Sequence, residues 1–131
     1  MKYLIDTDWI IDYLKSVIPV EKKIRELYTQ GLAVSIISLA ELYEGVHSSK
    51  YPAKEKELLD RFFESDLKIL GINENICNIF GQERSKLRKR GKLIDNFDLL
   101  IASTALNYKL TILTNNRKHF ERIAGLKIIS I

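Results

Sequence analysis

Short apolar runs alternate with longer segments of helical periodicity along almost the whole chain. The apolar runs have strand length and occupy residues 2–6, 33–37, 67–70, 110–114 and 127–130. Apolar side chains recur at helical spacing within residues 8–15, 19–30, 39–47, 53–64, 74–90, 96–107 and 117–123. Strands separated by helices form parallel sheets, because the helix carries the chain back to the edge where the strand began. We therefore predict a single-domain α/β/α sandwich with a mostly parallel, roughly five-stranded central sheet.

The composition is that of an ordinary globular domain. The chain has 131 residues, of which 46% are hydrophobic and 29% charged, so we expect one domain over residues 1–131. Cys77 is the only cysteine, which excludes an intramolecular disulfide and a cysteine-rich zinc site. No apolar stretch is long enough to cross a bilayer, and Asp6 comes too early for a signal peptide. We expect a cytoplasmic protein without a membrane partner.

Three acidic residues stand where an apolar run gives way to a helical segment: Asp6, Glu41 and Asp98. They are 35 and 57 residues apart (41−6 and 98−41). Ligands of parallel sheets bind beyond the carboxyl ends of the strands, so these distant acids can meet at one edge. Carboxylates without histidine or cysteine partners suit a hard cation such as Mg²⁺ or Mn²⁺. The pattern favours a metal site for phosphate chemistry.

Each acid also has a local explanation. Residues 38–41 (Ser-Leu-Ala-Glu) and 95–98 (Asp-Asn-Phe-Asp) both have the form of a capping box. Asp8 can cap the first helix, which would leave Asp6 as an acid at a strand end. Capping is the simpler hypothesis for any one of them. It does not require several acids to converge, and convergence is what a metal site needs.

Positive charge is concentrated in residues 83–92. This segment holds six basic residues and one acid, net +5, so the rest of the chain sums to −1 against the total of +4. Such a cluster can bind RNA phosphates, with Arg84 and Arg88 as candidate contacts. The alternative is a solvated helix end, since cations favour the last turn and Gly91 suits the position after it.

Four segments together resemble the PIN-domain ribonucleases. They are Tyr-Leu-Ile-Asp-Thr-Asp at 3–8, Ile-Ile-Ser-Leu-Ala-Glu-Leu-Tyr-Glu-Gly-Val at 36–46, Asp-Asn-Phe-Asp-Leu-Leu-Ile-Ala at 95–102 and Leu-Thr-Asn-Asn-Arg-Lys-His-Phe at 113–120. The resemblance extends from residue 2 to about residue 130 in order and spacing. Within the family, the chain is most similar to VapC-type toxins of toxin–antitoxin pairs.

The resemblance implies a metal-dependent endoribonuclease that leaves 5′-phosphate and 3′-hydroxyl ends. Asp6, Glu41 and Asp98 would be catalytic, and Asp6 and Asp98 would hold Mg²⁺ or Mn²⁺. Asn116 stands where the family often has an acid, so it and Asp95 are auxiliary candidates for a second, weaker metal site. The family also implies a homodimer and a small antitoxin protein. Apolar residues within 39–46 and 58–63 are candidates for the antitoxin groove or the dimer contact. The alternative is a satellite core under the helical hairpin that these residues form.

Two other functions compete with this one. Ile-Asp-Thr-Asp at residues 5–8 superficially resembles the Asp-x-Asp of haloacid-dehalogenase-like phosphatases, although Ile10 replaces the usual threonine or valine. The other alternative is a PIN-like RNA-binding or partner-binding module without catalysis. The two histidines, His47 and His119, lack the spacing of metal ligands, and the resemblance gives neither a catalytic role.

Overall fold

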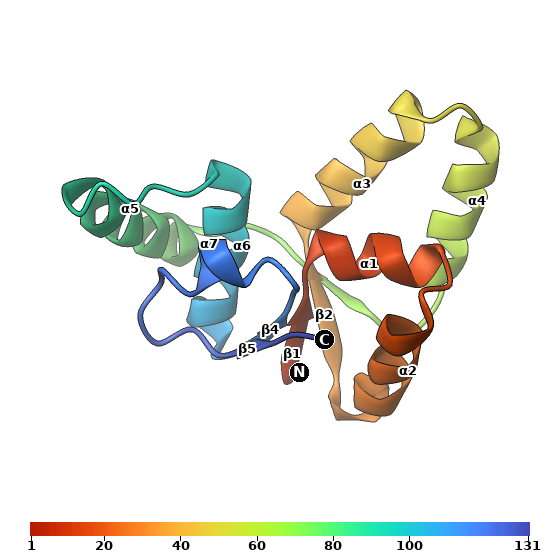
Figure 1. Ribbon diagram of the computed structural model, residues 1–131, viewed down its shortest axis with the longest axis horizontal. Helices are drawn as coiled ribbons and strands as arrows, with labels where there is room; N and C mark the ends of the chain where they lie inside the picture. Colours follow the sequence, from red (N-terminus) through yellow and green to blue (C-terminus); the bar gives the residue numbers. More distant parts are fainter.

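The computed structural model describes residues 1–131 and is built around five parallel strands (Figure 1). They are β1 (Tyr3–Ile5), β2 (Leu32–Ser35), β3 (Lys68–Leu70), β4 (Thr111–Leu113) and β5 (Ile128–Ile129), in the order β3-β2-β1-β4-β5. β1 is central: Leu4 is in register with Ala33 of β2 and with Ile112 of β4. The predicted fold class and strand number are confirmed.

Helices cover both faces of the sheet (Figure 1). Those of the first half of the chain are α1 (Thr7–Leu14), α2 (Ile18–Leu27), the short 3₁₀ helix η1 (Tyr28–Gln30), α3 (Ile36–Ser48) and α4 (Pro52–Phe63). Those of the second half are α5 (Glu74–Lys89), α6 (Asn96–Tyr108) and α7 (Arg117–Phe120). No helix is long and apolar enough to cross a membrane.

Side chains of β1, β2, β4 and β5 alternate between two separate cores, whereas the edge strand β3 is largely exposed. Ile5 of β1 and Val34 of β2 pack with Trp9 against α2, α3 and α4. Leu4 and Ala33, their neighbours in sequence, pack on the other face against α5, α6 and α7. Successive side chains of a strand point to opposite faces, so strands buried on both sides must be apolar throughout, as these are. The two cores fix the sheet between the helical layers.

The junction of β2 and α3 differs from the sequence prediction. A strand over 33–37 and a helix from residue 39 were expected, but the strand ends at Ser35 and the helix begins at Ile36. Ser35 is the N-cap, because its side chain accepts a hydrogen bond from the Ile37 amide. The apolar run continued into the first turn of the helix, and periodicity cannot locate such a boundary.

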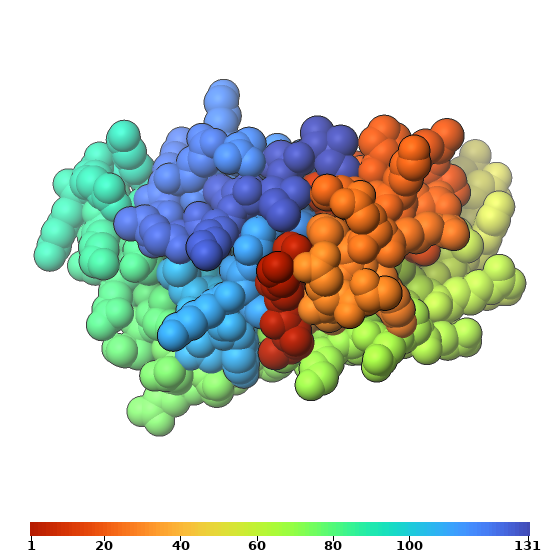
Figure 2. Space-filling view, turned by 90° about the horizontal axis from the view of Figure 1, so that it is seen from below, coloured from red at the N-terminus to blue at the C-terminus, as the bar shows by residue number.

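The edge where the strands begin is closed by tight packing. Viewed from that edge, the first residues lie between the segment that ends η1 and the segment that leads into β4 (Figure 2). Gly31 has a φ of 93°, and a Cβ there would lie 2.9 Å from the Met1 Cα. Only glycine fits this position. The opposite edge, where the strands end and α1, α3 and α6 begin, holds the candidate site.

Candidate functional site

Asp6 follows β1 and is nearly enclosed, with 4% of its surface exposed. One carboxylate oxygen accepts the Thr7 amide at 2.8 Å, which makes Asp6 the N-cap of α1. The other accepts the Thr114 hydroxyl at 2.7 Å, from the end of β4. The local alternative, in which Asp8 caps the helix and Asp6 is only an acid at a strand end, is wrong. Because β1 and β4 are neighbours, residues 108 positions apart meet at their carboxyl ends.

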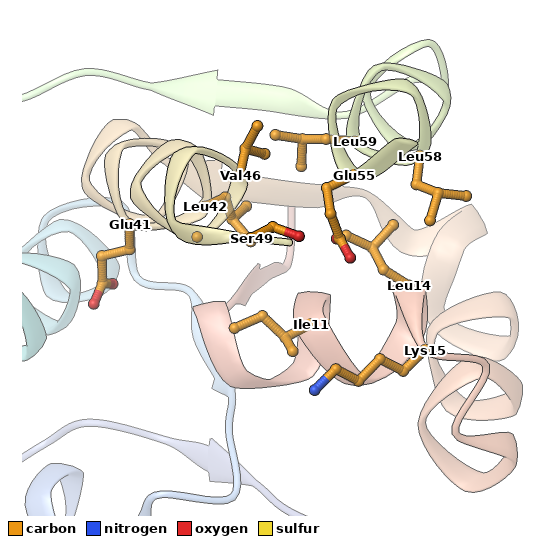
Figure 3. A pocket seen from close by; sticks show the side chains of 11 residues that line it. Ile11, Leu14, Lys15, Glu41, Leu42, Val46, Ser49, Glu55, Leu58 and Leu59 are labelled. Atoms are coloured by element: carbon orange, nitrogen blue, oxygen red, sulfur yellow. The ribbon is translucent and has the colours of Figure 1, made fainter. Parts of the chain in front are cut away.

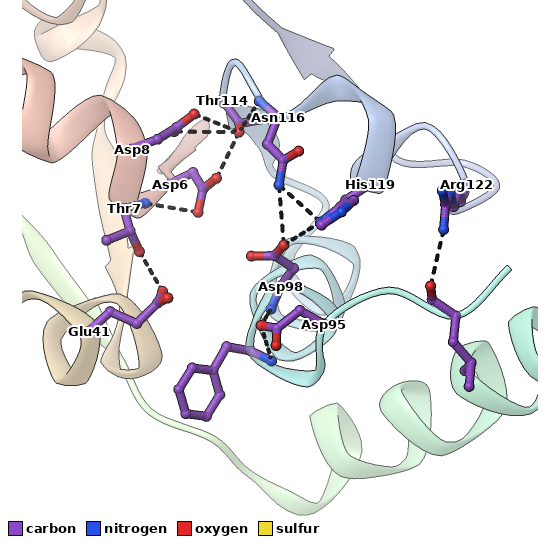
Figure 4. A network of polar contacts seen from close by, with 12 residues as sticks. Asp6, Thr7, Asp8, Glu41, Asp95, Asp98, Thr114, Asn116, His119 and Arg122 are labelled. Atoms are coloured by element: carbon purple, nitrogen blue, oxygen red, sulfur yellow. Dashed lines mark hydrogen bonds and ion pairs between the residues drawn. The ribbon is translucent and has the colours of Figure 1, made fainter.

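Asp8 is a site residue that the sequence argument missed. Its Oδ2 accepts the Asn115 amide at 3.0 Å and lies 3.4 Å from the Thr114 hydroxyl oxygen. Asp6 and Asp8 therefore share Thr114 as a neighbour (Figure 4). The Asp-x-Asp spacing was visible in the sequence, but the residues that Asp8 contacts follow β4, and no local pattern indicates that contact.

Glu41 projects from α3 toward α1. The Thr7 hydroxyl donates to Glu41 Oε1 at 2.7 Å (Figure 4). It also lies 2.9 Å from the buried Ser38 hydroxyl. Ser38 and Glu41 are thus inside the helix, and the capping box expected over residues 38–41 is absent. Glu41 is oriented by a contact across the site, which a local cap would not provide.

Asp98 lies one turn into α6. The N-cap is Asp95, whose Oδ2 accepts the Phe97 amide at 3.0 Å, so capping is confirmed for Asp95. Asp98 turns the other way: its Oδ2 is 2.7 Å from His119 Nδ1 and accepts the Asn116 amide group at 3.2 Å (Figure 4). The sequence argument gave His119 no role. Its position depends on α7 folding back against α6.

The acids repel one another and have no lysine or arginine partner. The pKa of Asp6 is raised to about 7, mainly because burial disfavours the charged form and then because Asp8 is close. Burial also raises the pKa of Asp8 and that of Glu41, and the Asp98 charge adds to the effect on Glu41. Among all ion pairs, only the one with His119 involves any of these four acids.

The donor set fits a hard divalent cation in its chemistry. As the side chains stand, no three acids, histidines or cysteines are close enough to form a ligand cluster. However, every acid donor is a carboxylate oxygen, and the buried Asp6 has only other acids as charged neighbours. A divalent cation would relieve that repulsion.

Positive charge adjoins the site through α5. Arg84 is half-buried, and its Nε donates to the Asn96 side chain at 3.0 Å, in the first turn of α6. Arg88 lies one turn further along α5 and is exposed. Gly91 follows the end of α5 with a φ of 65°. A glycine with positive φ is also what an ordinary solvated helix end would have at this position. Arg84 is therefore held against the start of α6, the helix that carries Asp98, whereas RNA binding stays a prediction.

An apolar groove of about 300 Å³ runs between α1, α3 and α4 (Figure 3). Ile11 and Leu14 come from α1, Leu42 and Val46 from α3, and Leu58 and Leu59 from α4. Glu41, which contacts Thr7 at the acidic site, also lines one end of the groove. The two apolar segments singled out in the sequence thus face one another.

Comparisons with known proteins assign the family. The PIN-domain profile matches residues 3–126. Ribonuclease VapC1 of Methanocaldococcus jannaschii is 38% identical over 97% of this chain and 86% of its own. Ribonuclease VapC2 of Haemophilus influenzae is 35% identical over 97% and 96%. The crystal structure of VapBC2 from Rickettsia felis bound to a promoter DNA fragment contains a chain of TM-score 0.93 and 32% identity, with 100% and 99% coverage. With the family motifs at one sheet edge, the chain belongs to the PIN-domain family.

Proposed function

We propose that the chain is a metal-dependent endoribonuclease that hydrolyses RNA phosphodiester bonds and acts as the toxin of a VapBC-type toxin–antitoxin system. The observation that carries the proposal is the convergence of Asp6, Asp8, Glu41 and Asp98 at one edge of a PIN-domain sheet without a lysine or arginine partner. The relatives named ribonucleases support the reaction class. Membership of the PIN family leaves no support for the phosphatase alternative.

Asp6 and Asp98 would hold Mg²⁺ or Mn²⁺, with Asp8 beside them. A divalent ion there supplies Lewis acidity: it lowers the pKa of a bound water and neutralises charge on phosphoryl oxygens. Thr114 keeps Asp6 in place by donating to Oδ2, and the Thr7 amide occupies Oδ1. The burial that raises the pKa of Asp6 makes its ionised form dependent on a nearby cation.

Glu41 would orient the attacking water and accept its proton. Thr7 donates to Oε1, so Oε2 is the oxygen left for water. Burial raises the pKa of Glu41, and a carboxylate with a raised pKa is a better base. Arg84 would bind an RNA phosphate while its contact with Asn96 keeps it at the start of α6. Arg88 would bind the next stretch of backbone.

Cleavage of RNA by the purified protein tests the proposed reaction. We expect Mg²⁺ or Mn²⁺ to support cleavage, EDTA to abolish it, and the products to carry 5′-phosphate ends. Asp98→Asn should eliminate turnover while Asp66→Asn, a change of an exposed acid outside the site, should not. Undiminished cleavage in excess chelator would refute the metal dependence. RNA binding without cleavage by the unmodified protein would favour the non-catalytic alternative.

The groove between α1, α3 and α4 would accept an amphipathic helix of the antitoxin. Its apolar walls suit apolar residues at helical spacing, and the Glu41 end suits a basic side chain that would reach the acids. We expect the product of the gene immediately upstream to co-purify with the chain and to inhibit cleavage. Leu58→Glu should prevent the complex from forming while the isolated toxin still cleaves RNA. Ile18→Glu, at an exposed position of α2, should leave both the complex and cleavage unchanged. A complex that tolerates Leu58→Glu would place the antitoxin elsewhere.

We also propose that the toxin is a homodimer, as the family resemblance implies. Sedimentation of the isolated chain and of the Leu58→Glu variant measures this separately. A dimer that persists in the variant leaves the groove free for the antitoxin. A monomeric variant together with a dimeric unmodified chain would instead assign the groove to a second copy.

A further inference from the structure

Asp98 is restrained through one of its two oxygens. His119 Nδ1 and Asn116 Nδ2 approach Oδ2 at 2.7 and 3.2 Å, and Oδ1 receives no hydrogen bond. A carboxylate only accepts, so the nitrogen of His119 that faces it must carry a proton. Figure 4 shows the free oxygen on the side of Asp6 and Glu41. Both donors come from the segment after β4, and both fix the same oxygen.

We propose that His119 is a positioning residue that orients Asp98 for the reaction; this inference rests on the proposed function. The terminal torsion of an aspartate is broad, so an unrestrained Asp98 would present either oxygen in many directions. With Oδ2 fixed from the α7 side, Oδ1 would be the oxygen presented to the metal. Residues behind the ligands of a metal commonly act in this way, and their loss costs roughly 10- to 100-fold in metal affinity or activity.

His119 contributes little to the packing of the fold. It lies on α7, a helix of four residues, and the side chain is 37% exposed. The packing of α7 on the sheet is provided by its neighbour Phe120, which is fully buried in the second core. The remaining ring nitrogen, Nε2, makes no hydrogen bond within the protein. Nδ1 also lies 3.0 Å from Asn116 Nδ2, a contact between two donors when Nδ1 is protonated. The shortest contact of the imidazole is the one with Asp98, at 2.7 Å.

Two amide substitutions at His119 distinguish the role of Nδ1 from that of Nε2. In His119→Asn the side-chain amide nitrogen can occupy the position of Nδ1, so the hydrogen bond to Asp98 can be kept. In His119→Gln the amide nitrogen corresponds in reach to Nε2, so that bond is lost. Both variants are neutral and similar in size, and His119→Ala removes both positions. His47→Asn, an exposed histidine in the last turn of α3, is the matched control.

Mn²⁺ binding is measured by electron paramagnetic resonance without RNA, and cleavage is measured at saturating Mn²⁺. We expect His119→Ala and His119→Gln to weaken Mn²⁺ binding roughly 10- to 100-fold. His119→Asn should restore binding to within a few-fold, and His47→Asn should not change it. KM for RNA at saturating Mn²⁺ should stay the same in all variants, because His119 acts through Asp98.

Three results would overturn the inference. Unchanged Mn²⁺ affinity in His119→Ala would show that Asp98 needs no orientation. An equal loss in the Asn and Gln variants would exclude the contact through Nδ1. A raised KM for RNA with normal Mn²⁺ binding would make His119 a direct RNA contact through Nε2. Failure of the unmodified protein to bind Mn²⁺ or cleave RNA would instead refute the proposed function, so the two failures are distinguishable.

Discussion

Asp6 is buried among other acids, so its charge should make the metal-free fold less stable as the pH rises. Its pKa is raised from 3.8 to about 7, about three units, and each unit corresponds to ~1.36 kcal/mol. Below pH 3.8 the carboxyl is neutral in both the folded and the unfolded chain. Between pH 3.8 and 7 the unfolded chain has lost the proton and the folded chain keeps it. Stability falls through this window by about 4 kcal/mol in total.

Asp6→Asn removes this penalty and preserves the local structure. Asparagine is a good N-cap, and its carbonyl oxygen can still accept the Thr7 amide. In EDTA, we expect the free energy of unfolding of Asp6→Asn to rise relative to that of the unmodified protein. The difference should grow by up to about 1.4 kcal/mol per pH unit between pH 4 and 7. At pH 8 its free energy of unfolding should be higher by about 4 kcal/mol, although it should be inactive. The free energy of unfolding of Asp66→Asn, a change at an exposed position, should equal that of the unmodified protein at every pH.

The assay is urea unfolding in EDTA at intervals from pH 4 to 8.5, with matched scans in 10 mM Mg²⁺. Mg²⁺ should restore the stability of the unmodified protein at pH 8 more than at pH 5, because protons compete with the metal for Asp6. It should stabilise Asp6→Asn little at either pH. Parallel stability curves for the unmodified protein and Asp6→Asn between pH 4 and 7 would refute the reasoning.

Three further outcomes are expected. Neutralising Arg84 and Arg88 together should weaken RNA binding equally for all RNA sequences. The slope of log affinity against log salt concentration should become shallower by about 0.7 per lost contact. An unchanged slope would show that the basic residues of α5 form only a solvated helix end. Asn116→Asp should tighten a second ion and move activity to lower metal concentration, whereas the unmodified protein should bind one metal well in calorimetry without RNA. Leu59→Ala, a fully enclosed leucine of the first core, should cost about 2–5 kcal/mol of unfolding free energy; a cost below 1 kcal/mol would show that the core collapses around it.

The periodicity of the chain determined the sheet. Strand-length apolar runs between amphipathic segments require a parallel sheet covered on both faces, and the two cores have that composition. Because parallel strands place their carboxyl ends at one edge, the acids that follow β1 and β2 were expected to converge before any contact was known. Asp95 was equally predictable, since an N-cap depends only on neighbouring residues.

Contacts between distant segments were decided by the tertiary structure alone. The sequence does not state that β4 lies beside β1, and only that order brings Thr114 to Asp6 and Asn115 to Asp8. The same holds for His119, which reaches Asp98 because α7 packs against α6. Strand order and helix packing follow from how the whole core fills, whereas periodicity reports only which face of each element is buried.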